Sequence, residues 1–229
     1  MDWIVRNIEE IQRKIAQAAK KSGRTAKDVT LVAVTKSVAA EVINQAIAAG
    51  ISDIGENRVQ EAREKFSSLA PVRRHMIGHL QTNKVNQAIE LFDLIHSVDS
   101  LRLGEAIARR AARQGKVMPI LVQVNISGEA TKYGVAPEET LALVRALSGF
   151  VSLEVAGLMT ICPAVEDPEE VRPYFRQMRL LKEEIEQQGF PLKYLSMGMS
   201  GDYEVAVEEG ANMVRIGTAL FQKRCDHGA

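Results

Sequence analysis

Short apolar segments alternate with longer amphipathic segments along almost the whole chain. In the first amphipathic segment an isoleucine recurs at helical spacing from Ile4 to Ile15, with charged residues between, and Gly23 follows as a stop signal. This pattern predicts an N-terminal helix with one buried face. The next segment, LVAVTK at 31–36, is too short for a helix and is typical of a strand buried on both faces.

The same alternation then continues to the end of the chain. Strands are predicted at 31–36, 52–57, 74–80, 93–99, 119–126, 153–161, 193–200 and 212–220. Helical spacing falls between them, at 39–49, 58–69, 82–91, 100–114, 137–148, 168–188 and 203–209. Strands that alternate with helices predict βαβ units and a parallel sheet.

Eight β/α units in 229 residues are within the usual size of a (β/α)₈ TIM-type barrel, here with an extra N-terminal helix. The alternative is an open doubly wound sheet, but its G-x-G-x-x-G fingerprint does not follow the first strand. Because no linker or shift in composition divides the chain, we predict a single α/β domain over residues 1–229.

Composition narrows the function classes. A hydrophobic fraction of 46% and a charged fraction of 25% are typical of a soluble globular protein. The 29 basic and 29 acidic residues cancel, which argues against a nucleic-acid partner. No apolar run reaches the roughly 18 residues of a membrane span, and the N-terminus lacks the apolar block of a signal peptide. We therefore expect a cytoplasmic protein with neither a membrane nor a nucleic-acid partner.

In a barrel of this kind the chemistry lies at the carboxyl ends of the strands. Polar or functional residues stand near all eight of these ends: Lys36, Glu56, Asn57, His79, Ser97, Asp99, Asn125, Met159, Thr160, Ser200, Arg215, Gly217 and Thr218. Together they indicate a site at that end of the barrel. The two cysteines, Cys162 and Cys225, and the histidines show no metal-ligand spacing, so no metal site is predicted.

Two of these residues have a charge that is unusual in an apolar strand. Lys36, at the mouth of the first strand, can lose hydration and become a nucleophilic amine, or it can extend its charge to the rim. Arg215 is either half of a core ion pair, with Glu56 as one candidate partner, or a donor aimed at a ligand. The residues alone leave both choices open.

The last two strands are followed by a possible phosphate cradle. Ser200 precedes a helix that begins near Asp202, and Gly217 with Thr218 precedes the last short helix. Glycines and helix N-termini favour anions, and barrels of this type often bind phosphate after strands seven and eight. Ordinary N-capping explains the same residues. The charge of Asp202 would also repel a phosphate unless it points away.

Several motifs together resemble one known family. They are AVTK (33–36), GENRVQE (55–61), HMIGHLQTNK (75–84), HSVDS (96–100), QVNISGE (123–129), GLMTI (157–161), LSMGMSGD (195–202) and MVRIGT (213–218). The chain is identified as a member of the pyridoxal-phosphate homeostasis protein family, which is similar to the barrel domain of alanine racemase. The resemblance runs from the first strand to the eighth.

The resemblance implies a site for pyridoxal 5′-phosphate (PLP). It assigns the Schiff base to Lys36, the phosphate to Ser200, Gly217 and Thr218, the pyridine nitrogen to Arg215, and the walls of the ring pocket to Asn57, His79 and Met159. It assigns no catalytic residue. Arg58 departs from the family, where tyrosine is common at this position.

The family resemblance implies a PLP-binding protein of vitamin B6 and amino-acid or keto-acid homeostasis, without strong turnover. An arginine at the ring nitrogen disfavours its protonation and makes the ring a poorer electron sink. The alternatives are an amino-acid racemase of the single-barrel type and an aldolase-like Schiff-base enzyme whose substrate carries a phosphate. We expect a monomer, with PLP-dependent apo-enzymes as possible protein partners.

Overall fold

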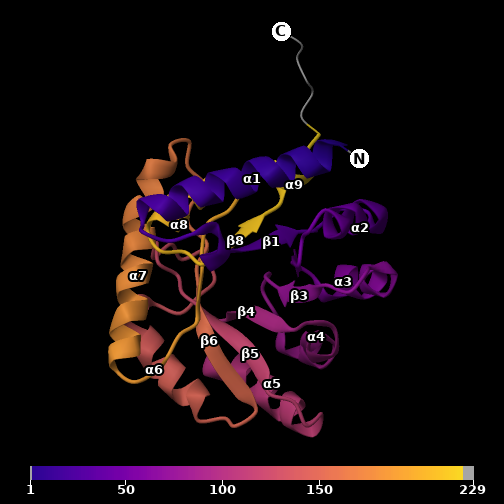
Figure 1. Ribbon diagram of the computed structural model, residues 1–229. Coiled ribbons are helices and arrows are strands. Elements are labelled where there is room, and N and C mark those ends of the chain that lie inside the picture. Colours follow the sequence, from indigo (N-terminus) through magenta and orange to yellow (C-terminus); the bar gives the residue numbers. More distant parts are fainter. Residues whose placement is uncertain (1, 224–229) are drawn as a thin grey trace.

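The structure is a computed structural model that describes residues 2–223 (Figure 1). Its strands are β1 (Thr30–Val34), β2 (Asp53–Glu56), β3 (Arg73–Met76), β4 (Leu94–Val98), β5 (Met118–Gln123), β6 (Leu153–Met159), β7 (Tyr194–Ser196) and β8 (Met213–Ile216). They form a closed barrel in which every strand runs parallel to the next one in the chain and β8 pairs with β1. The predicted barrel is confirmed, and the alternative of an open sheet is wrong.

Helices connect the strands and surround the barrel (Figure 1). They are α1 (Asp2–Lys21), α2 (Ala40–Ala48), α3 (Val59–Lys65), α4 (Val85–Leu91), α5 (Leu101–Arg113), α6 (Pro137–Ser148), α7 (Arg172–Gln187), α8 (Tyr203–Glu208) and α9 (Thr218–Phe221). Short 3₁₀ turns lie at η1 (Ala26–Asp28), η2 (Phe66–Ser68), η3 (Thr82–Lys84) and η4 (Pro168–Val171). Among the described residues, no helix is long and apolar enough to cross a membrane.

The extra N-terminal helix is confirmed. In Figure 1, α1 is the long indigo helix that lies across α8 and α9. Its four isoleucines from Ile4 to Ile15 are all at most 3% exposed. A side chain of this size contributes about 1.5–3 kcal/mol when fully buried. The amide of Asn7 also donates to the carbonyl oxygens of Leu220 (3.0 Å) and Gln222 (3.1 Å), which ties α1 to the end of the barrel.

Several strands end earlier than the apolar pattern predicted. β1 ends at Val34, so Lys36 lies in the turn that follows, where Ser37 has a φ of 57°. β8 ends at Ile216 and α9 begins at Thr218, so the predicted strand through residue 220 is wrong in its last part. The chain has to leave the barrel here to reach the outer layer, and the side chains at these exits are free to face a ligand.

The barrel interior combines a small apolar cluster with buried polar groups. Successive residues of a strand point alternately outward to the helices and inward. The inward apolar residues form their own cluster: Val32, Leu94, Leu121, Ala156, Met159, Tyr194 and Met213. The polar residues buried among the strands include Asp53, His75, His96, Ser196 and Arg215.

Candidate active site

Lys36 stands on a firmly held turn. The preceding residue, Thr35, is fully buried. Its backbone N–H donates to Gly55 O (3.0 Å), its hydroxyl donates to Glu56 Oε1 (2.7 Å), and its carbonyl accepts from Lys65 Nζ (2.9 Å). The side chain of Lys36 itself is exposed, so burial does not desolvate its amine. The barrel therefore fixes the backbone at Lys36 and leaves the amine accessible.

Glu56 pairs with Lys65 and not with Arg215. Lys65 Nζ lies 2.7 Å from Glu56 Oε1, and the Glu56 side chain is fully buried. The ion pair suggested between Glu56 and Arg215 is wrong. Asp53 points into the barrel, and Glu56, three residues later on the same strand, faces the opposite side of the sheet, towards α3.

Arg215 is the buried cation of the site. Its Nη1 donates to Ser196 Oγ (2.7 Å) and its Nη2 donates to Thr160 O (2.8 Å). The residue is 3% exposed, and burial lowers the pKa of its guanidinium to about 10, so it remains protonated at neutral pH. Both accepting oxygens are neutral, so no carboxylate is hydrogen-bonded to Arg215 through these contacts. The charge of the nearby Asp202 carboxyl acts on the guanidinium and opposes the lowering of its pKa.

Behind Arg215 lies a series of polar contacts that sequence reasoning missed. Ser196 Oγ is 3.1 Å from His96 Nδ1, His96 Nε2 is 2.9 Å from His75 Nδ1, and His75 Nε2 is 2.9 Å from Asp53 Oδ1. The sequence spacing of these two histidines bears only on metal binding and indicates no contact between them. The available signal was strand alternation, since His96 stands two residues after an inward-facing leucine.

The loops after β7 and β8 meet at the predicted phosphate cradle. Ser200 Oγ accepts a hydrogen bond from the backbone N–H of Ala219 (3.2 Å). A Cβ on Gly217 would lie 3.3 Å from Val34 Cβ and 3.4 Å from Val34 O, so the missing side chain lets this loop approach the end of β1. Thr218, next to it, is exposed. The structure thus brings Ser200, Gly217 and Thr218 to one corner of the rim, beside β1.

Asp202 does not cap α8 with its side chain. Its Oδ1 accepts from the backbone N–H of Met199 (2.6 Å), and burial raises the pKa of this carboxyl. The carboxylate therefore closes the loop after β7, and the N-capping alternative is wrong for this residue.

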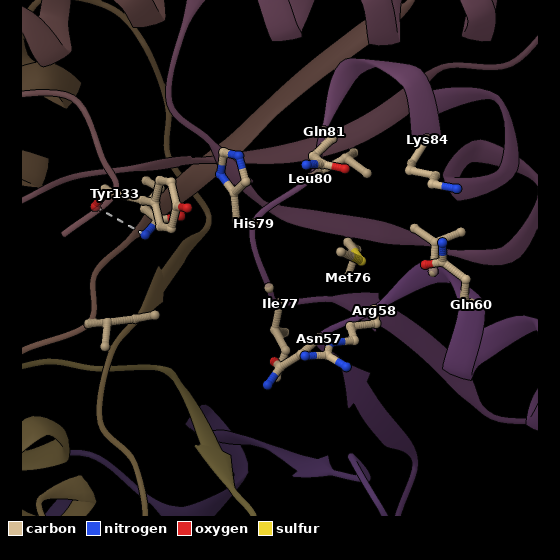
Figure 2. Close-up of a pocket in the computed structure, with 14 residues that line it drawn as sticks. Asn57, Arg58, Gln60, Met76, Ile77, His79, Leu80, Gln81, Lys84 and Tyr133 are labelled. Carbon is tan, nitrogen blue, oxygen red and sulfur yellow. Dashed lines mark hydrogen bonds between the residues drawn. The ribbon is translucent and has the colours of Figure 1, made fainter. Parts of the chain in front are cut away.

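A cleft of about 640 Å³ opens at the carboxyl ends of β2 and β3 (Figure 2). Asn57, Arg58 and His79 line it. The close approach of its two loops depends on Gly78, because a Cβ there would lie 2.3 Å from Asn57 O. The residues that line this cleft do not include Lys36, Arg215, Ser200, Gly217 or Thr218. Met159 is fully buried in the cluster inside the barrel.

His79 and Tyr133 form a stacked pair on one wall of the cleft (Figure 2). Their ring centroids are 4.0 Å apart and the ring planes differ by 15°. His79 Nδ1 also lies 3.8 Å from Asp99 Oδ2, which gives the imidazole an acidic neighbour. Sequence spacing showed neither contact, because Tyr133 and Asp99 belong to different loops.

Within residues 2–223, no three His, Cys, Asp or Glu side chains are grouped so that they could hold a metal ion. Cys162 is buried as a free thiol. Cys225 lies outside the described residues.

The comparisons with known proteins agree with this geometry. Residues 6–224 match the family described as alanine racemase, N-terminal domain. The chain belongs to this family. The pyridoxal phosphate homeostasis protein of Aquifex aeolicus is 42% identical over 220 residues, which cover 95% of this chain and 96% of that protein. The resemblance found in the sequence motifs is confirmed.

Solved structures of other family members share the barrel. A protein of unknown function from Bifidobacterium adolescentis has a TM-score of 0.89 and 36% identity, covering 96% of this chain and 95% of its own. PipY of Synechococcus elongatus, solved with PLP bound, has a TM-score of 0.78 and 38% identity, covering 90% of this chain and 99% of its own. A family member of nearly the same length therefore binds PLP.

Proposed function

We propose that this chain is a single-domain PLP-binding protein that serves vitamin B6 and amino-acid or keto-acid homeostasis. The observation that supports it best is the closure of the barrel between β8 and β1. It sets the Gly217 loop against the end of β1, two residues before Lys36. An amine and a phosphate corner thus lie on neighbouring strands, and PipY was solved with PLP bound.

The residues present fit such a cofactor. The phosphate corner offers a hydroxyl at Ser200, a hydroxyl at Thr218 and a backbone that can approach an anion closely at Gly217. The buried guanidinium of Arg215 keeps its charge and lies on β8, immediately before that corner. No ion pair with a carboxylate neutralises Lys36 among the described residues, so its amine is available.

Each side chain then has a separate task. Lys36 would bind the carbonyl carbon of PLP, and Ser200, Gly217 and Thr218 would bind its phosphate. Arg215 would disfavour protonation of the ring nitrogen by like charge. Bound PLP supplies an electrophilic carbonyl and an electron-withdrawing ring. A ring nitrogen kept neutral by Arg215 would make the ring a weaker electron sink, which suits a carrier better than a carbanion-forming enzyme.

The remaining walls of the ring pocket are assigned to Asn57, His79 and Met159 in this proposal. Asn57 and His79 line the cleft at the ends of β2 and β3, whereas Lys36 and Arg215 do not, so the family resemblance carries this assignment. We further propose that the protein acts as a cytoplasmic monomer and exchanges PLP with apo-enzymes. An open rim suits this exchange, since the Lys36 amine is exposed.

Borohydride reduction followed by peptide mass mapping tests the proposal. Reduction of the PLP-loaded protein should fix one pyridoxyl-phosphate mass on the peptide that contains Lys36. Lys36→Ala should lose the label, while Lys84→Ala, which removes a lysine of the neighbouring cleft, should keep it. A label found only at another lysine overturns the assignment. If the purified protein shows no absorbance band near the visible range, an aldolase-like Schiff-base enzyme is favoured instead.

One observation favours a racemase as the second candidate. Two-base racemisation needs an acid/base on each side of the substrate carbon. Besides Lys36, the rim offers the imidazole of His79, which has the carboxyl of Asp99 3.8 Å away. The holo-protein should nevertheless form D-enantiomers from pure L-alanine or L-serine only slowly, as followed by chiral chromatography. A turnover near or above about 1 s⁻¹, lost in Lys36→Ala, would make the protein a racemase.

A further inference from the structure

Five buried polar side chains form one unbroken line of hydrogen-bond contacts through the barrel. In order along the line they are Arg215, Ser196, His96, His75 and Asp53, and each is at most 7% exposed. The four contacts between them measure 2.7, 3.1, 2.9 and 2.9 Å. The line crosses the interior from β7 to β4, which are not neighbours in the barrel, and ends at the first residue of β2.

The two ends of this line fix the direction of every proton in it. A guanidinium can only donate, so Ser196 Oγ is the acceptor at one end. A carboxylate can only accept, so His75 Nε2 must donate to Asp53 at the other end. If both imidazoles are neutral, His75 Nδ1 accepts from His96 Nε2–H, and His96 Nδ1 accepts the hydroxyl proton of Ser196. Every contact is then satisfied once, and all donors point towards Asp53.

The opposite arrangement needs an additional proton. His75 would be an imidazolium that donates to both Asp53 and His96, and His96 would donate to Ser196. The surroundings disfavour this state. Burial lowers the pKa of His75, and the nearby charge of Arg73 acts in the same direction, against the pull of Asp53 and Asp93. For His96, burial lowers the pKa further, aided by His75, Arg215 and Arg73.

We propose that Ser196, His96, His75 and Asp53 are positioning residues that hold the Arg215 guanidinium through a one-directional relay. This inference rests on the proposed function in one respect: the guanidinium faces the ring nitrogen of PLP. In the relay, the hydroxyl oxygen of Ser196 accepts from Arg215 while its hydroxyl proton is donated to His96. This second hydrogen bond polarises the hydroxyl and makes its oxygen a stronger acceptor for Arg215.

The relay also separates a negative charge from the cofactor. A carboxylate bonded directly to Arg215 would neutralise the guanidinium and favour protonation of a nearby ring nitrogen. Here the carboxylate of Asp53 is four hydrogen bonds away, at the opposite end of the barrel. The charge of Asp202 also acts on Arg215, but Asp202 is not hydrogen-bonded to it. The relay thus holds the guanidinium in place without a hydrogen-bonded counter-ion.

The histidine ring signals of the cofactor-free protein test the relay directly. Two-dimensional ¹H–¹⁵N spectra should show His75 and His96 as neutral rings that are protonated at Nε2. Neither ring should titrate between about pH 5.5 and 8, the range in which an unperturbed histidine changes its charge. Ser196→Ala should shift the His96 Nδ1 signal, because this nitrogen loses its donor. A doubly protonated His75, or a His96 protonated at Nδ1, overturns the proposed direction.

Ser97→Ala is the matched control. Ser97 is also buried and is next to His96 in sequence, but its hydroxyl has no hydrogen-bond partner among the described residues. This variant should leave both histidine signals unchanged. Equal shifts in the two serine variants would mean that the signals report general repacking and would overturn the relay.

A second measurement tests the effect on the cofactor. The absorbance of the PLP-loaded protein should be followed against pH in the wild type and in both serine variants. Ser196→Ala should gain a protonation step on the acid side that the wild type and Ser97→Ala lack, because a loosened Arg215 no longer excludes a proton from the ring. Identical profiles would overturn the coupling to PLP. A wild type that binds no PLP would overturn the proposed function, while the histidine signals would still decide the relay.

Discussion

Replacing Lys65 with methionine tests how the barrel holds the turn that precedes Lys36. Methionine keeps the length of the apolar stem but removes the ammonium group. Lys65 Nζ lies 2.7 Å from Glu56 Oε1 and 2.9 Å from the carbonyl oxygen of Thr35. The variant would therefore leave a carboxylate that is 0% exposed without its cation, and would release the backbone next to Lys36.

The size of the effect follows from burial. Removing one partner of a buried ion pair costs about 3–5 kcal/mol, because the other charge stays buried and uncompensated. For a urea slope of about 2–3 kcal/mol per molar, this loss lowers the unfolding midpoint by roughly 1–2.5 M. Circular dichroism during urea titration measures it. PLP binding should weaken as well, since the anchor of Lys36 is loosened.

Lys182→Met is the matched control. Lys182 Nζ also lies 2.7 Å from a glutamate oxygen, and its side chain is 19% exposed against 16% for Lys65. Its partner Glu186, however, is 36% exposed on α7, and such surface pairs contribute only about 0.2–1 kcal/mol. Adding Glu56→Gln to Lys65→Met should restore much of the stability, because it removes the stranded charge. Equal small losses in both lysine variants would refute the reasoning.

Three further outcomes are expected. Ser200→Ala combined with Thr218→Val should clearly raise the dissociation constant for PLP in a fluorescence titration. Each hydrogen bond to a charged group contributes about 1.5–3 kcal/mol, or roughly tenfold to a hundredfold in affinity. Unchanged binding would mean that the phosphate binds elsewhere. Burial raises the pKa of the Cys162 thiol from 9.0 to about 12, so the folded protein keeps a proton that the unfolded chain releases. The free energy of unfolding should therefore fall as the pH rises from 9 towards 12, by at most about 1.4 kcal/mol per pH unit, and a slope that stays the same in Cys162→Ala would contradict this. Light scattering at micromolar concentration should give a mass near 25.2 kDa, whereas twice this value would show a dimer.

The sequence determined the architecture because the signals for it are local. Buried strands and amphipathic helices differ in length and periodicity, and each is read within about ten residues. All eight predicted strands are present, with ends that differ by a few residues. The parallel βαβ order then places every strand's carboxyl end at one rim. For this reason Lys36, Ser200 and Arg215 could be singled out before their neighbours were known.

Only the tertiary structure decided which side chains meet. From charge alone, Glu56 is one candidate partner for Arg215. The direction in which each strand residue points instead pairs Glu56 with Lys65 and Arg215 with Ser196. The contact between His96 and Ser196 joins residues 100 positions apart across the interior. Such contacts depend on how the strands are staggered and how the whole barrel closes. A local sequence pattern does not contain this information.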